Sequence, residues 1–353
     1  MSRSEPTLTT GGLVDLQVNG FAGVDFNTPG LTGTDLDRAL RAMLASGVTR
    51  CLPTLITGSE TNLAACFRAL EAAVAASELG RAMVAGYHLE GPFISREDGF
   101  RGCHPAAHVR PADPAFFDRL QEAANGRIRL VTLAPEAPGA LDLIDRLVAR
   151  GIVVALGHTA ADPATLREAA ARGAALSTHL GNGVARLLPK GENPILSQLA
   201  DDRLTASFIA DGVHIPPDTL KVYLRAKGLD RAILVTDAVA GASAAPGDYR
   251  LGDVAITRGT EPVIQITGSA SLAGSALCLD QAVRNIMAWL DLTLDEAVRL
   301  ARDNPLRAIG EAPDQSRVWW RRTGDGGLPV IENVEAGAIR WGSTESPPHP
   351  IGA

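Results

Sequence analysis

The sequence predicts a (β/α)8 barrel, a fold in which eight parallel strands alternate with helices around one closed core. Short apolar runs of strand length alternate with amphipathic helical stretches from about Leu13 to Ile309. Polar residues, several of them histidines, follow these runs, which is typical of barrels whose strand ends carry a functional site. A chain of 353 residues, 46% of them hydrophobic, is long enough to bury a core of this size.

The eight strand candidates are short and apolar. They are residues 13–18, 48–55, a strand that begins in the apolar run 82–85 and ends at Glu90, and then 128–133, 152–156, 174–177, 204–209 and 232–235. Helical patterns lie between most of them, at residues 36–45, 62–76, 115–124, 141–150, 163–171 and 218–227. We expect an inserted β-hairpin at residues 249–266 and two closing helices at 275–290 and 294–309.

The alternation stops beyond Gly310, so we expect a catalytic domain at residues 11–310 and a C-terminal extension at 311–353. Within the extension, residues 316–322 are basic and aromatic, and residues 328–341 have the pattern of one or two strands. Residues 347–353 are expected to form a loose tail.

Composition excludes several classes of function. The net charge of −7 is spread along the chain, which argues against nucleic acid or an anionic membrane as partner. No apolar run approaches the roughly 20 residues that span a bilayer, and the first residues lack the apolar stretch of a signal peptide. Four widely spaced cysteines indicate reduced thiols. We therefore expect a cytoplasmic protein.

Polar side chains at the strand ends predict a metal site. Glu90 lies directly before a Gly-Pro break. It is either a structural carboxylate or a hard metal ligand, and its position alone does not distinguish these two roles. The strand-end residues together are Gln17, Asn19, Glu90, His158, His179, His214 and Asp237. A single strand-end histidine is more often just a hydrogen-bonded polar residue, but one carboxylate and two imidazoles on three strands match a catalytic zinc-type site with a position open for water.

Three further residues have two interpretations each. Asp237 is either a turn former or a general base that takes a proton from the attacking water. His104 and His214 are either surface or packing residues, or donors to a carbonyl oxygen or a substrate hydroxyl.

Six motifs follow one another in a specific order. They are His88-Leu-Glu-Gly-Pro-Phe93, Gly157-His-Thr159, Thr178-His-Leu-Gly-Asn182, Ala210-Asp-Gly-Val-His214, Thr236-Asp-Ala238 and Leu272-Ala-Gly-Ser275. In this order they resemble the N-acetylglucosamine-6-phosphate deacetylases of the amidohydrolase superfamily. The resemblance covers roughly residues 11–310.

The resemblance implies a role for each of these segments. Glu90, His158 and His179 would hold one catalytic divalent metal, zinc or iron, with Asp237 as acid and base and His104 polarising the acetamide carbonyl. The implied substrate contacts are Cys103, His104, Asn182, Gly183, Asp211, His214, Leu272, Ala273 and Gly274. Many amidohydrolases hold a second metal with His-x-His on the first strand. Here the place reads Gln17-Val-Asn19, and because amides are poor ligands we expect one tight metal.

The chain departs from the family pattern in three places. The family stretch Gly-Arg-Glu-Pro, whose arginine grips the phosphate, reads Gly191-Glu-Asn-Pro194 here, so Arg186 or Lys190 would have to supply the charge. Gly183 stands where the family has alanine, which indicates a slightly altered sugar pocket. Only about a dozen residues precede the first strand, so the β-sandwich of the relatives is expected to be reduced or missing.

The resemblance also implies a homodimer. The adjacent Trp319 and Trp320 are expected to be exposed and to cover the barrel surface or a subunit interface.

The leading hypothesis is therefore deacetylation of N-acetylglucosamine 6-phosphate, giving glucosamine 6-phosphate and acetate. One alternative keeps the chemistry but acts on an unphosphorylated N-acetyl sugar or another N-acyl or cyclic amide. A less favoured one is a sugar-binding barrel without catalysis, and the complete set of Glu90, His158, His179 and Asp237 argues against it.

Overall fold

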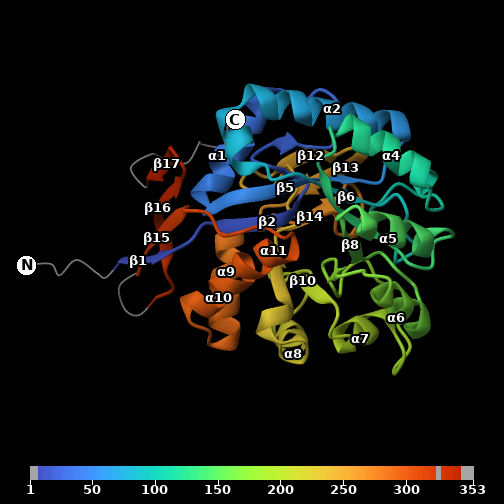
Figure 1. Ribbon diagram of the computed structural model, residues 1–353. Helices are drawn as coiled ribbons and strands as arrows, with labels where there is room; N and C mark the ends of the chain where they lie inside the picture. The colour runs from blue at the N-terminus through green and yellow to red at the C-terminus, as the bar shows by residue number, and fades with distance from the viewer. Residues whose placement is uncertain (1–6, 323–326, 343–353) are drawn as a thin grey trace, which may run out of the picture.

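Eight parallel strands form the barrel that the sequence predicts (Figure 1). The computed structural model describes residues 7–322 and 327–342. The expected tail at 347–353 lies outside them. Around the barrel the order is β2 (Leu13–Val18), β5 (Val48–Ile56), β6 (Tyr87–Glu90), β7 (Ile128–Leu133), β8 (Val153–Leu156), β9 (Leu176–Ser177), β10 (Thr205–Ile209) and β11 (Ala232–Val235). Neighbours in sequence are neighbours in space, so every site-bearing strand end faces the same rim.

The barrel closes between its first and last strands. The backbone N–H of Asp237 donates to the Gln17 carbonyl at 2.8 Å. Beneath it, the buried Asp15 carboxylate accepts the Thr236 hydroxyl at 2.6 Å and the Thr236 N–H at 3.2 Å. Burial raises the pKa of Asp15 to about 7, although these hydrogen bonds lower it. A polar carboxyl group therefore joins β2 to β11 inside the wall.

Helices cover the outside of the barrel. They are α1 (Gly33–Ala45), α2 (Glu60–Ala76), α3 (Glu78–Met83), α4 (Pro114–Ala123), α5 (Ala140–Ala149), α6 (Pro163–Ala171), α7 (Pro194–Ala200), α8 (Pro217–Lys227), α9 (Leu279–Leu290), α10 (Leu294–Ala301) and α11 (Asp303–Ala308). Their starts follow local chemistry: Thr32 with Asp35, and Thr293 with Glu296, form capping boxes. None of the helices in the described ranges is both long and apolar enough to cross a membrane.

Several expected boundaries were wrong. The apolar run 82–85 is not the start of a strand, because α3 extends to Met83 and β6 begins only at Tyr87. The single helix expected at 294–309 is two helices separated at Arg302. Pro305 accounts for this break, because its ring has no N–H and would clash with the carbonyl four residues earlier. The inserted hairpin is a three-stranded sheet of β12 (Gly247–Leu251), β13 (Val254–Arg258) and β14 (Ile264–Ile266).

A separate four-stranded sheet lies at one side of the barrel in Figure 1 and combines a strand before the barrel with three strands after it. Its order is β1 (Thr7–Thr10), β15 (Arg317–Arg321), β16 (Val330–Ala336) and β17 (Ile339–Gly342). Trp320 is completely buried, so the expected exposed tryptophan pair is wrong for this residue. Its indole N–H donates to Thr10 Oγ1 at 2.9 Å, and its ring belongs to the same apolar core as the barrel.

Candidate metal centre and active site

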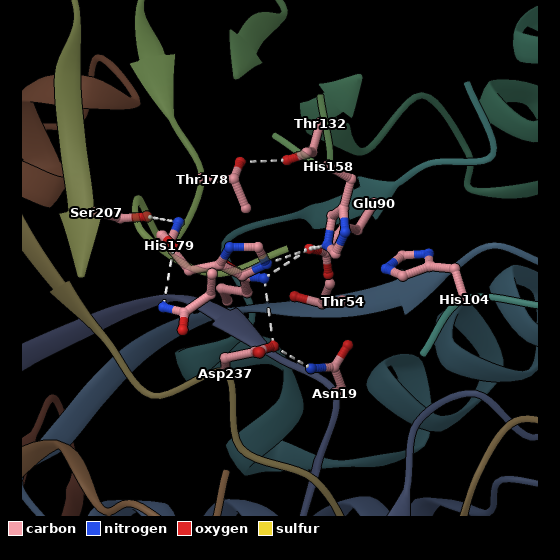
Figure 2. Close-up of polar contacts among 12 residues, drawn as sticks. Asn19, Thr54, Glu90, His104, Thr132, His158, Thr178, His179, Ser207 and Asp237 are labelled. Atoms are coloured by element: carbon pink, nitrogen blue, oxygen red, sulfur yellow. Dashed lines mark hydrogen bonds and ion pairs between the residues drawn. The ribbon is translucent and has the colours of Figure 1, made fainter. Parts of the chain in front are cut away.

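Glu90 is the centre of the site (Figure 2). Its Oε1 lies 3.0 Å from His179 Nε2, 3.2 Å from His158 Nε2 and 3.0 Å from Gln17 Nε2. Glu90, His179 and His158 are only 2%, 3% and 6% exposed. Burial works against the charged carboxylate, but its close contacts with the imidazoles of His158 and His179 outweigh burial and hold the pKa of Glu90 well below its usual range. The structure thus brings together the three predicted ligands from three strands.

The hydrogen bonds of His158 favour a cation at this point. His158 Nδ1 lies 2.9 Å from the carbonyl oxygen of Phe100, which can only accept, so Nδ1 carries the proton. With its proton on Nδ1, the ring has Nε2, which faces Glu90, available as the nitrogen that binds a metal. Glu90 and His158 would both be available to a bound metal ion, and a backbone carbonyl is a usual hydrogen-bond partner for the other ring nitrogen of a metal-binding imidazole. The residues present therefore fit a divalent metal.

His104 is a competing third ligand. Ligand atoms of Glu90, His104 and His158 lie within 4.8 Å of one another. However, His104 Nδ1 lies 3.4 Å from the backbone N–H of Thr57 and 2.8 Å from its hydroxyl. A backbone N–H can only donate, which favours Nδ1 as acceptor and Nε2 as the protonated nitrogen. We therefore prefer His179, whose Nε2 already contacts Glu90, as the third ligand.

Asp237 lies beside this cluster at the end of β11. Its Oδ1 accepts from Asn19 Nδ2 at 2.7 Å and from Gln17 Nε2 at 3.3 Å. Burial first, and then the charge of Glu90, raise the pKa of Asp237 to about 6. The two amides predicted as the remnant of a second metal site direct N–H donors at carboxylates, so they serve as hydrogen-bond donors here.

Three of the site residues have strained backbones. His158, His179 and Asp237 have φ values of 51°, 29° and 50°, in the left-handed region that side-chain-bearing residues rarely adopt. Each lies two residues after the last residue of its strand. Such strain persists only where the surroundings enforce it, and it concentrates at functional sites.

A cavity of about 770 Å³ opens above the cluster. Of the predicted residues, those that line it are His179, Asn182, Gly183, Arg186, His214, Asp237, Leu272 and Gly274. Asp211 supports His214 from behind, with its Oδ2 2.6 Å from His214 Nδ1. Gly183 needs its small size: its φ is 57°, and a Cβ there would lie 2.6 Å from His158 Nδ1.

Other predicted residues do not line this cavity. Lys190 is exposed, and the following Gly191 and Glu192 line a separate surface hollow next to α7. Asn193 caps α7, with its Oδ1 accepting from the Leu196 N–H at 3.0 Å. Ala273 is buried and Cys103 packs against apolar neighbours of the inserted sheet.

Sequence reasoning missed several contributors. The rim loops also supply Gly99, Gly102, Gly181, Val184, Val213, Ile266, Ala270 and Ser271 to the cavity. Glu136 supports the loop of His158, because its carboxylate accepts the Thr159 hydroxyl and the Ala160 N–H, both at 2.6 Å. A carboxylate three residues past the end of β7 was the available signal.

Comparison with known proteins assigns the chain to a family. No protein-family model matches. The chain is 36% identical over 313 residues to the N-acetylglucosamine-6-phosphate deacetylase of Bos taurus, covering 85% of this chain and 74% of that protein. It is 34% identical over 298 residues to the N-acetylgalactosamine-6-phosphate deacetylase of Shewanella sp. strain ANA-3, covering 84% and 73%. The chain belongs to the N-acetylglucosamine-6-phosphate deacetylase family.

A solved member of the family has the same fold. It is a mutant N-acetyl-D-glucosamine-6-phosphate deacetylase from Mycobacterium smegmatis in complex with N-acetyl-D-glucosamine-6-phosphate. The TM-score is 0.84 at 31% identity, over 93% of this chain and 85% of that one.

Proposed function

We propose that this family member hydrolyses N-acetylglucosamine 6-phosphate to glucosamine 6-phosphate and acetate, using one bound divalent metal. The observation that supports it most directly is the approach of two imidazole nitrogens to Glu90 Oε1, next to a sugar-sized cavity that His179 and Asp237 line. Its relatives at 30% identity or more are named as deacetylases of amino-sugar phosphates.

Glu90, His158 and His179 would hold the metal, and zinc is the ion we propose. Such an ion supplies Lewis-acid chemistry when bound, since it lowers the pKa of water and polarises carbonyl groups. A carboxylate with two imidazoles is a ligand set that suits zinc and leaves room for a further ligand. Metal analysis of the purified protein would test the identity of the ion.

Asp237 is the proposed proton carrier. Its Oδ1 is engaged by Asn19 and Gln17, which leaves Oδ2 free to take the proton of the water that attacks the acetamide carbon. The carboxyl group then donates this proton to the amine nitrogen as the C–N bond breaks. Burial raises the pKa of Asp237, which suits a group that must both accept and donate.

His104 is proposed to donate to the acetamide oxygen. With Nδ1 accepting from Thr57, the proton on Nε2 can bind the negative charge that develops on that oxygen. The His104 and His158 rings lie 4.3 Å apart, so the donor stands next to a metal ligand.

The rim of the cavity would bind the sugar and its phosphate. Asn182, His214 and the backbone of Leu272 and Gly274 offer polar contacts. Arg186 is the cationic side chain among the residues that line the cavity, and we assign it the phosphate in place of the arginine that Glu192 replaces.

Acetate release by the purified protein tests the function. The substrates are N-acetylglucosamine 6-phosphate, the free sugar and N-acetylgalactosamine 6-phosphate, each with and without a metal chelator. We expect chelator-sensitive activity, with kcat/KM for the 6-phosphate exceeding that for the free sugar by orders of magnitude. Faster turnover of the free sugar would instead select the unphosphorylated alternative, and no chelator-sensitive turnover of any of them would refute the proposal.

A homodimer is the proposed assembly, as the resemblance implies. Leu187 is 92% exposed and follows Arg186 at the cavity rim, which makes it a candidate contact. Light scattering coupled to size exclusion would measure the molar mass.

A further inference from the structure

A chain of buried polar groups crosses the barrel just below the metal site. His88 Nε2 lies 2.7 Å from Thr132 Oγ1, which lies 2.6 Å from Thr178 Oγ1 (Figure 2 shows the two threonines). His88, Thr132 and Thr178 are 1%, 0% and 5% exposed. We call these three residues the polar layer. Layers inside such barrels are usually filled by branched aliphatic side chains, so polar groups here require a reason.

Each member of the polar layer is adjacent to a proposed metal ligand. His88 precedes Glu90 by two residues on β6, so the two side chains point to the same side of the strand. Thr132 pairs with Glu90 in the register of β6 and β7. Thr178 directly precedes His179.

Gly157 brings the third ligand into the same arrangement. It follows β8, which lies between β7 and β9, and it directly precedes His158. A Cβ at this position would lie 2.8 Å from Thr132 Cγ2 and 2.8 Å from Thr178 Cβ. The two threonines therefore approach each other over the glycine, and the φ of this glycine is not positive. Position 157 therefore needs glycine because the polar layer leaves no space for a side chain, and not because the backbone conformation requires glycine.

We propose that His88, Thr132 and Thr178 are positioning residues that set the spacing of Glu90, His158 and His179 for the metal. The inference rests on the proposed function, because it takes these three side chains as the ligands. The hydrogen bonds that connect His88, Thr132 and Thr178 fix the distances between the ends of β6, β7 and β9. His158 and His179 also have strained backbones, which only the surrounding structure can hold in place.

Stability alone does not explain the polar layer. Replacing both partners of a buried hydrogen bond by apolar groups of the same shape is often neutral or stabilising. Valine has the shape of threonine, so valines at 132 and 178 remove both partners of the threonine pair together, and the remaining cost is that of His88 Nε2, which loses its partner Thr132. Groups that orient metal ligands, in contrast, typically contribute about 10- to 100-fold in metal affinity.

The experiment measures zinc affinity of the metal-free full-length chain, by competition with a chromophoric chelator, together with the apparent Tm of the metal-free protein. The test variants are T132V/T178V, which removes both hydroxyls, and T132S/T178S, which keeps them but removes methyl groups. T49V is the matched control, because Thr49 is 2% exposed and bonds Ser316 at 3.2 Å from the opposite end of β5. G157A adds a methyl group between the threonines.

Zinc affinity and Tm should change independently of each other. We expect T132V/T178V to bind zinc about 10- to 100-fold more weakly, with a Tm lowered no further than that of T132S/T178S, because only His88 Nε2 loses its partner. T132S/T178S should keep nearly wild-type affinity with a lower Tm, and T49V should keep its affinity. G157A should weaken zinc binding. Wild-type affinity in T132V/T178V would overturn the positioning role and leave the proposed function intact, whereas no zinc binding by the wild-type chain would overturn both.

Discussion

At the scale of single residues, the site depends on which nitrogen or oxygen of each side chain is already engaged. Phe100 occupies His158 Nδ1, and Thr57 occupies His104 Nδ1, with opposite hydrogen-bond polarity. One imidazole therefore presents a lone pair and the other an N–H. The same residue type acquires two roles from two backbone neighbours, and no sequence motif encodes that difference.

Asp237→Asn should abolish proton transfer without disturbing the fold. The amide has the same shape but cannot accept the proton of water, so we expect kcat to fall by about 10²- to 10⁴-fold, with metal content retained. Asp202→Asn is the control, since the Asp202 side chain is 78% exposed and pairs with Arg231. Full activity in Asp237→Asn would show that the proton carrier is another group.

His104→Asn and His179→Asn distinguish the two candidate ligand sets. We expect His179→Asn to lose most of its bound metal, because it removes a ligand, and His104→Asn to keep it while kcat falls. Metal content is measured by mass spectrometry on the purified proteins. The reverse pattern would make His104 the third ligand.

At the scale of elements, strand and helix types followed from periodicity, but their limits depended on packing. Within the run 82–85, Met83 and Val84 are buried at the end of α3, and apolarity by itself does not separate a buried helix end from a strand. The sequence did not decide which cation of the loop after β9 would contact the phosphate, since the loop contains both Arg186 and Lys190. Only the folded loop separates them, with Arg186 at the cavity and Lys190 outside it.

Arg186→Gln and Lys190→Gln make a matched pair on this loop. Losing a charged hydrogen bond to phosphate costs about 1.5–3 kcal/mol, so we expect KM for the 6-phosphate to rise about 10- to 100-fold in Arg186→Gln. Turnover of the free sugar should be unchanged, and Lys190→Gln should resemble the wild type. A larger effect of Lys190→Gln would show that Lys190, and not Arg186, binds the phosphate.

At the scale of the whole molecule, closure of the barrel makes stability depend on pH. Burial raises the pKa of Asp15 from 3.8 to about 7. Between these values the folded state holds a proton that the unfolded state releases, so this contribution is fully present below about pH 4 and is lost as the pH rises towards 7.

Asp15→Asn removes the contribution of Asp15 to the pH dependence of stability. We expect the Tm of the metal-free wild type to fall relative to that of Asp15→Asn as the pH is raised from 4.5 to 7.5. Thermal unfolding of both proteins across this range measures it. A difference that stays constant with pH would show that Asp15 is already charged in the folded state.

The sequence by itself determined the (β/α)8 class, the order of the strands and the candidate ligands, because hydrophobic periodicity and strand-end chemistry are local properties. Long-range contacts decided the rest. Only the tertiary structure joined β1 to β15, β16 and β17 in one sheet and buried Trp320. It also set the donor and acceptor roles of His104 and His158, and it placed Thr132 and Thr178 over Gly157. Each of these depends on atoms brought together from distant parts of the chain, which no local pattern records.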